Sequence, residues 1–320
     1  MTPAKRTGAE TVDDQRVNLL ALCAVPGMSW SLVAREALRP GGVHELREGR
    51  PRERSDEAAD AVASIAKAAA EFPKHVDRVR AELASAANAG ARLTTVLDDD
   101  YPPNLRVIYN LPPFLFYRGV LEPDDARAVA VVGTRSASAD GLRRARAVAR
   151  GLARDGVTVL SGLAKGIDAA AHRATLESGS RTIAVLGTGI LRCYPKEHEA
   201  LAEEIAQKGA LVSQFWPSAP PTRTSFPMRN VVMSGLGQGT VVVEASVTSG
   251  AKMQARLALL HGKKVFLMRS LVAEQSWARS YVDRGAIEIA SVADVVRDLR
   301  TRKAVELLSE QRQQLLFDAL

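Results

Sequence analysis

Short apolar runs, most of them rich in valine, recur through the second half of the chain and alternate with stretches of helical periodicity. Each run is continuous rather than alternating between apolar and polar residues, which is typical of strands buried on both faces of a sheet. Strands that alternate with helices predict right-handed βαβ units and an α/β fold with a doubly wound, mostly parallel sheet. The predicted strands are Ala128–Val132, Val157–Leu160, Thr182–Leu186, Ala210–Ser213, Thr240–Val243, Lys264–Met268 and Ala286–Ile289.

The first 90 residues are rich in alanine, arginine and glutamate, and their periodicity predicts helices. Two breaks, Pro26-Gly27 and Pro40-Gly41-Gly42, divide this region. The predicted helical segments are 17–25, 30–38 and 56–89, the last with an interruption near Pro73.

A short segment dense in proline separates the helical region from the predicted sheet. Its apolar runs have the length of strands, and its prolines exclude helix. Beyond Leu299 we expect a single further helix. We therefore predict a helical domain at 1–90, a sheet domain at 91–299 with its proline-rich lead-in at 91–128, and a C-terminal helix at 300–320.

The composition is that of a globular protein with a basic balance: 43 lysines and arginines against 36 aspartates and glutamates give a net charge of +7 and a pI near 9.6. Such a balance permits a polyanion as a partner and does not by itself identify one. The two cysteines make neither a disulfide framework nor, by themselves, a zinc site. No stretch of about 18 apolar residues occurs, and the N-terminus lacks an apolar signal core, so we expect a cytoplasmic protein without a membrane span.

The loops after the valine-rich runs are the candidate binding sites, because ligands of open parallel sheets bind beyond the carboxyl ends of the strands. The first loop is Gly133-Thr134-Arg135-Ser136. Its glycine allows a tight turn, and Arg135 offers a bidentate contact to a phosphate. The G-x-G-x-x-G fingerprint and the P-loop lysine motif are both absent, so neither an NAD site nor a Walker site is indicated. Taken alone, an ordinary turn with a surface arginine is an equal alternative.

The second loop, Ser161-Gly162-Leu163-Ala164-Lys165-Gly166, precedes an alanine-rich helix. Gly162 and Gly166 allow close approach of the backbone, while Ser161 and Lys165 supply a hydroxyl and a cation for a phosphate. We expect Asp168, at the start of the helix, to act as a cap.

The third loop, Gly187-Thr188-Gly189, is followed by Tyr194 and Lys196. Single-stranded nucleic acid needs such a pair: a flat face for a base and a charge for its phosphate. Tyr194 is equally well explained as a core residue.

Three further positions complete the candidate surface. Arg229 can pair with a phosphate, and Asn230 can make amide contacts. Ser249-Gly250 lies at the start of another predicted helix, where an anion can bind. Glu244 caps the backbone or accepts from a ribose or base. Paired carboxylates, a metal-spaced His/Cys cluster and a nucleophile–base pair are not evident, so we expect a binding surface for a phosphate-bearing ligand, with no catalysis, metal or cofactor.

These motifs resemble those of the bacterial DNA-processing protein A (DprA, also called Smf) family, in the family's order, over roughly 92–298. The matching segments are Asp100-Tyr101-Pro102, LPPFL at 111–115, VVGTRSAS, SGLAKGIDAAAH, TIAVLGTGI, YPKEH, FPMRN and VVVEASVTSGA. The resemblance implies an extended Rossmann-like fold with a small N-terminal SAM-like domain. It further implies binding of single-stranded DNA in natural transformation or recombination, a homodimer, and loading of the RecA recombinase.

The residues expected to contact DNA or its phosphates follow from the loops and from this resemblance. They are Gly133, Thr134, Arg135, Ser161, Gly162, Lys165, Gly166, Gly187, Gly189, Lys196, Arg229, Asn230, Ser249 and Gly250.

The sequence departs from the family pattern at two positions of interest. Val231 follows FPMRN where relatives usually carry a second arginine, and Gln214 replaces their usual glutamate. An alternative function also stays open. Residues 237–245 resemble Rossmann-like proteins of the lysine-decarboxylase-like group, which implies a nucleotide-binding sensor or a nucleotide-cleaving enzyme.

Overall fold

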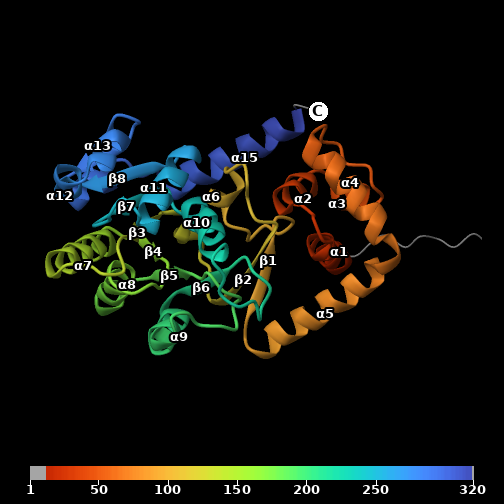
Figure 1. Ribbon diagram of the computed structural model, residues 1–320, viewed down its shortest axis with the longest axis horizontal. Helices are drawn as coiled ribbons and strands as arrows, with labels where there is room; N and C mark the ends of the chain where they lie inside the picture. The colour runs from red at the N-terminus through yellow and green to blue at the C-terminus, as the bar shows by residue number, and fades with distance from the viewer. Residues whose placement is uncertain (1–11, 319–320) are drawn as a thin grey trace, which may run out of the picture.

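The computed structural model describes residues 12–318, which fold around one nine-stranded sheet with the strand order β1-β2-β6-β5-β4-β3-β7-β8-β9 (Figure 1). The strands from β3 to β9 are parallel, whereas β2 pairs antiparallel with both β1 and β6. The strands are β1 (Arg92–Thr95), β2 (Phe114–Gly119), β3 (Ala128–Val132), β4 (Thr158–Ser161), β5 (Thr182–Val185), β6 (Ala210–Ser213), β7 (Gly239–Val242), β8 (Lys264–Met268) and β9 (Ile287–Ile289).

The predicted fold class is confirmed. All seven predicted strands are present, each displaced at its ends by no more than one residue. Along β3, Val129 and Val131 enter one apolar cluster, while Ala128, Ala130 and Val132 enter another on the opposite face. Both faces of this strand are therefore buried, which explains its unbroken apolar run.

The lead-in contributes the two antiparallel strands, but the prediction that its prolines exclude helix is wrong: Pro103 begins a short helix at Pro103–Arg106, where its missing N–H is not needed. Pro112 and Pro113 immediately precede β2 and lie outside its ladder, so the missing N–H groups cost the sheet no hydrogen bond. After β6 the chain crosses back to place β7 on the far side of β3. This crossing creates the topological switch point between β3 and β7.

Helices cover both faces of the sheet (Figure 1). Helices on one face pack into the apolar cluster that contains Val129 and Val131. Helices on the other face pack into the apolar cluster that contains Ala128. The helices of the sheet domain and the C-terminal region are α6 (Pro103–Arg106), α7 (Ala139–Arg154), α8 (Ile167–Glu177), α9 (Glu199–Lys208), α10 (Ser225–Leu236), α11 (Gly250–Leu260), α12 (Arg269–Glu274), α13 (Ser276–Val282), α14 (Val292–Arg297) and α15 (Arg302–Asp318).

Before the sheet, the described chain is helical, with the breaks where proline and glycine predicted them. The expected interruption near Pro73 is a short 3-10 turn at Ala69–Glu71, and Pro73 then stands in the first turn of the next helix, where its missing N–H is not needed. These helices are α1 (Val12–Ala24), α2 (Trp30–Ala37), α3 (Gly42–Arg47), α4 (Asp56–Ala68) and α5 (Phe72–Asn88).

Three aromatic side chains join these helices to the sheet domain. The ring centroid of Trp30, at the start of α2, lies 5.1 Å from that of Phe114 and 6.4 Å from that of Trp216, and the last two rings are 5.4 Å apart. Arg16 of α1 adds hydrogen bonds of 2.8 and 2.5 Å to the Asp98 carboxylate of the lead-in. The N-terminal helices are thus packed directly against the lead-in and the loop after β6.

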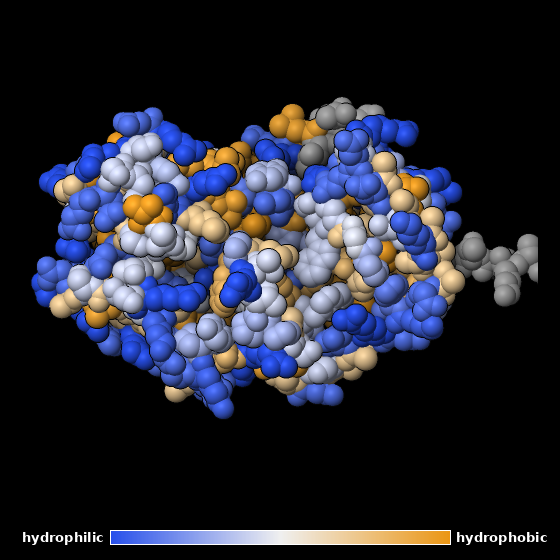
Figure 2. Space-filling view, in the orientation of Figure 1, coloured by the Kyte–Doolittle hydropathy of each residue, from blue (hydrophilic) through white to orange (hydrophobic). Residues whose placement is uncertain are grey.

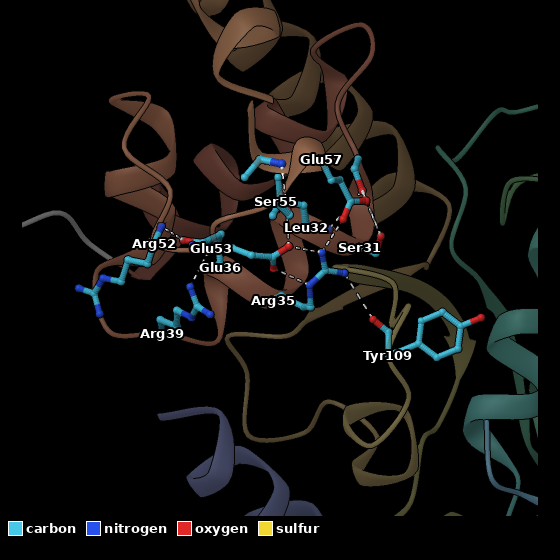
Figure 3. Close-up of polar contacts among 12 residues, drawn as sticks. Ser31, Leu32, Arg35, Glu36, Arg39, Arg52, Glu53, Ser55, Glu57 and Tyr109 are labelled. Atoms are coloured by element: carbon cyan, nitrogen blue, oxygen red, sulfur yellow. Dashed lines mark hydrogen bonds and ion pairs between the residues drawn. The ribbon is translucent and has the colours of Figure 1, made fainter. Parts of the chain in front are cut away.

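Arg35 organises the polar contacts around α2 (Figure 3). Its guanidinium donates to Glu53 at 2.8 and 3.0 Å and to Glu57 at 2.5 Å, and it reaches the Tyr109 carbonyl at 3.5 Å. Glu57 also accepts from the hydroxyl of Ser29, the N-cap residue of α2. The hydrogen bond from Arg35 holds the pKa of Glu53 below its usual value.

This ion pair predicts acid sensitivity of the N-terminal helices. Because the pKa of Glu53 is lowered in the folded state, its contribution to stability is complete above the unfolded value of 4.5 and is lost as the pH falls through the folded pKa. We expect the melting temperature of the wild type to fall more steeply below pH 4.5 than that of Glu53→Gln. Thermal melts across this pH range measure the difference. Glu48→Gln, at an exposed glutamate of the same region, should retain the wild-type slope.

Candidate nucleic-acid interface

Four loops meet at one edge of the sheet, which we call the rim. They follow β3, β4, β5 and β7, whose carboxyl ends share an edge because the strands are parallel. The Thr134 N–H donates to the Glu244 carbonyl at 2.7 Å, and the Ile167 N–H donates to the Thr134 carbonyl at 3.3 Å. The loop after β3 therefore contacts the loops after β7 and β4.

Close approach of the loops depends on glycine. Gly166 has a φ of +77°, and a Cβ there would overlap the Thr134 carbonyl oxygen, while a Cβ at Gly162 would overlap the Arg229 guanidinium. The other rim glycines are packed similarly: Gly133 against Ile167, Gly187 against the Phe226 ring, and Gly189 against the backbone of Trp216 and Pro217. These glycines make room for other segments of the protein itself.

Glu244 occupies the start of α7 at the switch point. Its carboxylate accepts hydrogen bonds from the N–H and the hydroxyl of Ser138, at 3.1 and 2.6 Å, and Ser138 is the N-cap residue of α7. A helix N-terminus attracts anions, and here the anion is a side chain of the protein. Of the two roles open from the sequence, the geometry matches the cap.

Asp168 fills the corresponding position in the loop after β4. This buried carboxylate accepts from the N–H groups of Gly162 and Ala164 at 3.1 and 3.4 Å. Burial raises its pKa, while Arg229 and the two amides act in the opposite direction. The predicted capping role of Asp168 is thus matched by its bonds to two amides of the loop that we predict to bind an anion.

Arg229, Asn230 and Ser161 lie beneath the loops. Arg229 is only 7% exposed, and it donates to the Val185 carbonyl at 2.8 Å and to Asn230 Oδ1 at 3.1 Å. Burial lowers its pKa, and Asp168 opposes this shift. The Ser161 hydroxyl is also buried and donates to the Val131 carbonyl at 2.7 Å. The side chains that we expected to meet a phosphate here hold strands and loops together.

Three residues form a row along the rim, which we call the platform: Arg135 and Tyr194, both exposed, and the half-buried Phe226 between them. The Arg135 guanidinium carbon lies 5.5 Å from the Phe226 ring centroid, and the Phe226 and Tyr194 centroids are 5.6 Å apart. Tyr194 is 46% exposed, so it is not a core residue. The platform offers aromatic faces beside a cation, as unpaired bases require.

Two predicted lysines, Lys165 after β4 and Lys196 two residues after Tyr194, are exposed. Lys165 forms a 2.5 Å ion pair with Glu197, which joins the loop after β4 to the segment after β5. Lys196 is the neighbour of Glu197. Beyond β7, Ser249 caps α11 by accepting from the Ala251 N–H at 3.2 Å, and Gly250 has open space around it.

Phe226 is the rim residue that the sequence did not single out. Its position between a proline-rich loop and the first turn of a helix was visible, but its contact with Arg135 joins residues 91 positions apart. Within residues 12–318, His, Cys, Asp and Glu side chains form no group of three able to hold a metal ion. No helix of the described chain has the length and apolar character needed to cross a membrane.

Comparison with known proteins places this architecture. The family model of DNA recombination-mediator protein A matches residues 92–300. The chain belongs to this family. It is 36% identical over 206 residues to the DNA processing protein DprA of Streptococcus pneumoniae, covering 64% of this chain and 73% of that protein. It is 38% identical over 203 residues to the protein Smf of Escherichia coli, covering 62% of this chain and 54% of that protein.

Solved structures of the family agree with the fold. The X-ray structure of DprA from S. pneumoniae superposes with a TM-score of 0.70 at 28% identity, covering 88% of this chain and 98% of that one. A structure of DNA processing protein A from Helicobacter pylori, described for its single-stranded DNA binding mode, gives a TM-score of 0.58 at 25% identity, covering 65% and 98%.

The close packing at the rim can be tested with one methyl group. Gly162→Ala should lower the free energy of unfolding by about 1–3 kcal/mol, because its Cβ meets a buried guanidinium that cannot move freely. Urea denaturation measures this change. Gly250→Ala is the matched control: its Cβ meets open space, so stability should change by less than about 1 kcal/mol. Equal effects of the two substitutions would contradict the packing described for the loop after β4.

Proposed function

We propose that this chain binds single-stranded DNA along the rim, without catalysing a reaction on it. The platform is the observation that carries the proposal, because it presents two aromatic faces and a guanidinium side by side at the surface. Bases stack on such faces only when they are unpaired, and the cation attracts the backbone. Lys165 and Lys196 extend the positive surface beside the platform. Family membership supports the same function.

The carboxylates at the rim weigh against a nucleotide sensor or a nucleotide-cleaving enzyme. A mononucleotide in a doubly wound fold places its phosphate on a helix N-terminus near the switch point. In this chain Glu244 occupies the start of α7, and Asp168 binds two amides of the loop before α8. A long polyanion held by exposed side chains does not need those positions.

The remaining parts of the proposal come from the family resemblance. We propose that the protein acts in the cytoplasm as a homodimer during transformation or recombination, and that it delivers its DNA to the RecA recombinase. The exposed platform supports this role, because DNA bound in an open row can be passed on without opening the protein.

Binding of a labelled oligonucleotide at several salt concentrations tests the platform. Arg135→Ala should weaken binding. It should also make the slope of log K against log salt concentration shallower by about 0.7 for each phosphate contact that is lost. Arg154→Ala serves as the control, because this exposed arginine ends α7 at the opposite edge of the sheet. Wild-type affinity and salt dependence in Arg135→Ala would reject the platform as the DNA site.

Tyr194→Ala separates stacking from charge. It should weaken binding by about 1–3 kcal/mol, the usual contribution of one stacked base, while leaving the salt dependence unchanged. Tyr194→Phe keeps the ring and should bind as the wild type does. The same titration measures both variants, and a loss of affinity in Tyr194→Phe as large as that in Tyr194→Ala would contradict a stacking role.

The ion pair between Lys165 and Glu197 predicts competition with DNA. Glu197 forms an ion pair with Lys165, the lysine that a phosphate would contact. Glu197→Gln should therefore increase the affinity for DNA, by about fivefold at most because the pair is exposed. Titration against Glu177→Gln, at an exposed glutamate that ends α8 at the opposite edge, provides the comparison. Weaker binding by Glu197→Gln would show that the pair orders the site instead of competing for it.

A further inference from the structure

A groove lies on the other side of α10 from the platform. This groove has a volume of about 340 Å³, and its walls come from the start of α2, the lead-in and α10. The lining residues that matter here are Met28, Trp30, Asn110, Gln214, Met228 and Val231. In the space-filling view, hydrophobic, intermediate and hydrophilic side chains are mixed across the middle of the face (Figure 2).

Val231 and Gln214 line the same space in this groove. An arginine and a glutamate placed there would bring two charges and a longer side chain into the groove. In this chain the nine lining residues, all in the described part, are uncharged, so the groove is open and neutral.

The groove continues the platform around one helix. Phe226 and Met228 are two residues apart on α10, which at about 100° per residue directs them to opposite sides of its first turn. Phe226 contacts Arg135 and Tyr194, while Met228, 43% exposed, lies at the groove. A flexible strand lying on the platform therefore reaches the groove by crossing a single helical turn.

We propose that the groove takes one unpaired base of the same DNA strand, an inference that rests on the proposed function. Half-buried Trp30 offers aromatic surface, and Met228, 43% exposed, offers polarizable sulfur, both suited to a flat heterocycle. Asn110 Oδ1 is buried and has no hydrogen-bond partner among residues 12–318. Together with Gln214, which is 5% exposed, it supplies amide groups for the edge of the base.

The absence of charge at positions 214 and 231 suits this occupant. A carboxylate at position 214 would repel the phosphates that flank a bound base, and an amide does not. A base on a buried amide is held by hydrogen bonding and stacking, so this contact adds affinity without adding salt dependence. The platform and the groove thus differ in a property that a titration resolves.

The test uses the full chain and a labelled single-stranded oligonucleotide. Val231→Phe narrows the groove, and we expect it to weaken binding by about fivefold or more relative to the wild type, without changing the salt dependence. Gln214→Glu changes charge at nearly constant size and should also weaken binding. Val120→Phe is the matched control, because Val120 is exposed and its N–H bonds to Gly209 at the edge opposite the rim.

A second readout does not depend on affinity. An oligonucleotide that carries 2-aminopurine loses fluorescence when that base stacks on Trp30. At saturating protein, Arg135→Ala should keep this quenching, whereas Val231→Phe and Gln214→Glu should relieve it.

The outcomes separate the two proposals. Weakened binding by Arg135→Ala together with wild-type binding and quenching in both groove variants would overturn the base site and leave the proposed function standing. A wild-type chain that does not bind single-stranded DNA overturns both. Relief of quenching in the groove variants, but not in Arg135→Ala, supports the base site. If Val231→Phe lowers the melting temperature, Gln214→Glu still tests the same contact, because it adds no bulk.

Discussion

The rim depends on two carboxylates that the protein directs at its own backbone. Glu244 binds the start of α7, and Asp168 binds the loop before α8, in each case satisfying donors that a helix or loop end would otherwise leave open. Arg229 lies among these groups with its guanidinium against Gly162 and its Nη1 on the Val185 carbonyl. Asp168 and Arg229 are both buried, so removing either would leave buried donors or a buried charge without a partner, which costs more than the contact itself contributes.

This constraint determines which ligand the rim can hold. With the backbone donors bound internally, recognition falls to side chains that project from the finished surface, and the platform is made of such side chains. Charge and aromatic faces on an open edge suit a flexible polymer, since each contact is weak and many are made along its length. A compact nucleotide gains most from an enclosed phosphate-binding site. At the rim, backbone donors of two loops already bind the carboxylates of Glu244 and Asp168.

The sequence predicted the parts of the fold that depend on local pattern. Continuous valine-rich runs located seven strands, because a parallel strand must be apolar on both faces, and parallel topology then implied that the loops would share an edge. β1 and β2 were harder, since prolines dominate the lead-in and their antiparallel pairing depends on β6. Burial of Ser161 and Arg229 was not predictable from local sequence either, because their partners Val131 and Val185 lie 30 and 44 residues away.

The position of the N-terminal helices follows from the same architecture and bears on function. Trp30 packs against Trp216, which belongs to the loop after β6, and so α2 stands beside α10 rather than apart from the sheet. The start of α2 is capped by Ser29, whose hydroxyl accepts from the Leu32 N–H and donates to Glu57, as the start of α7 is capped by Ser138 with Glu244. In the proposed base site, these helices contribute side chains to the groove. The Leu32 amide at the start of α2 is capped by Ser29, so the same proposal assigns the attraction of phosphate to the exposed cations Arg135 and Lys165, which follow β3 and β4.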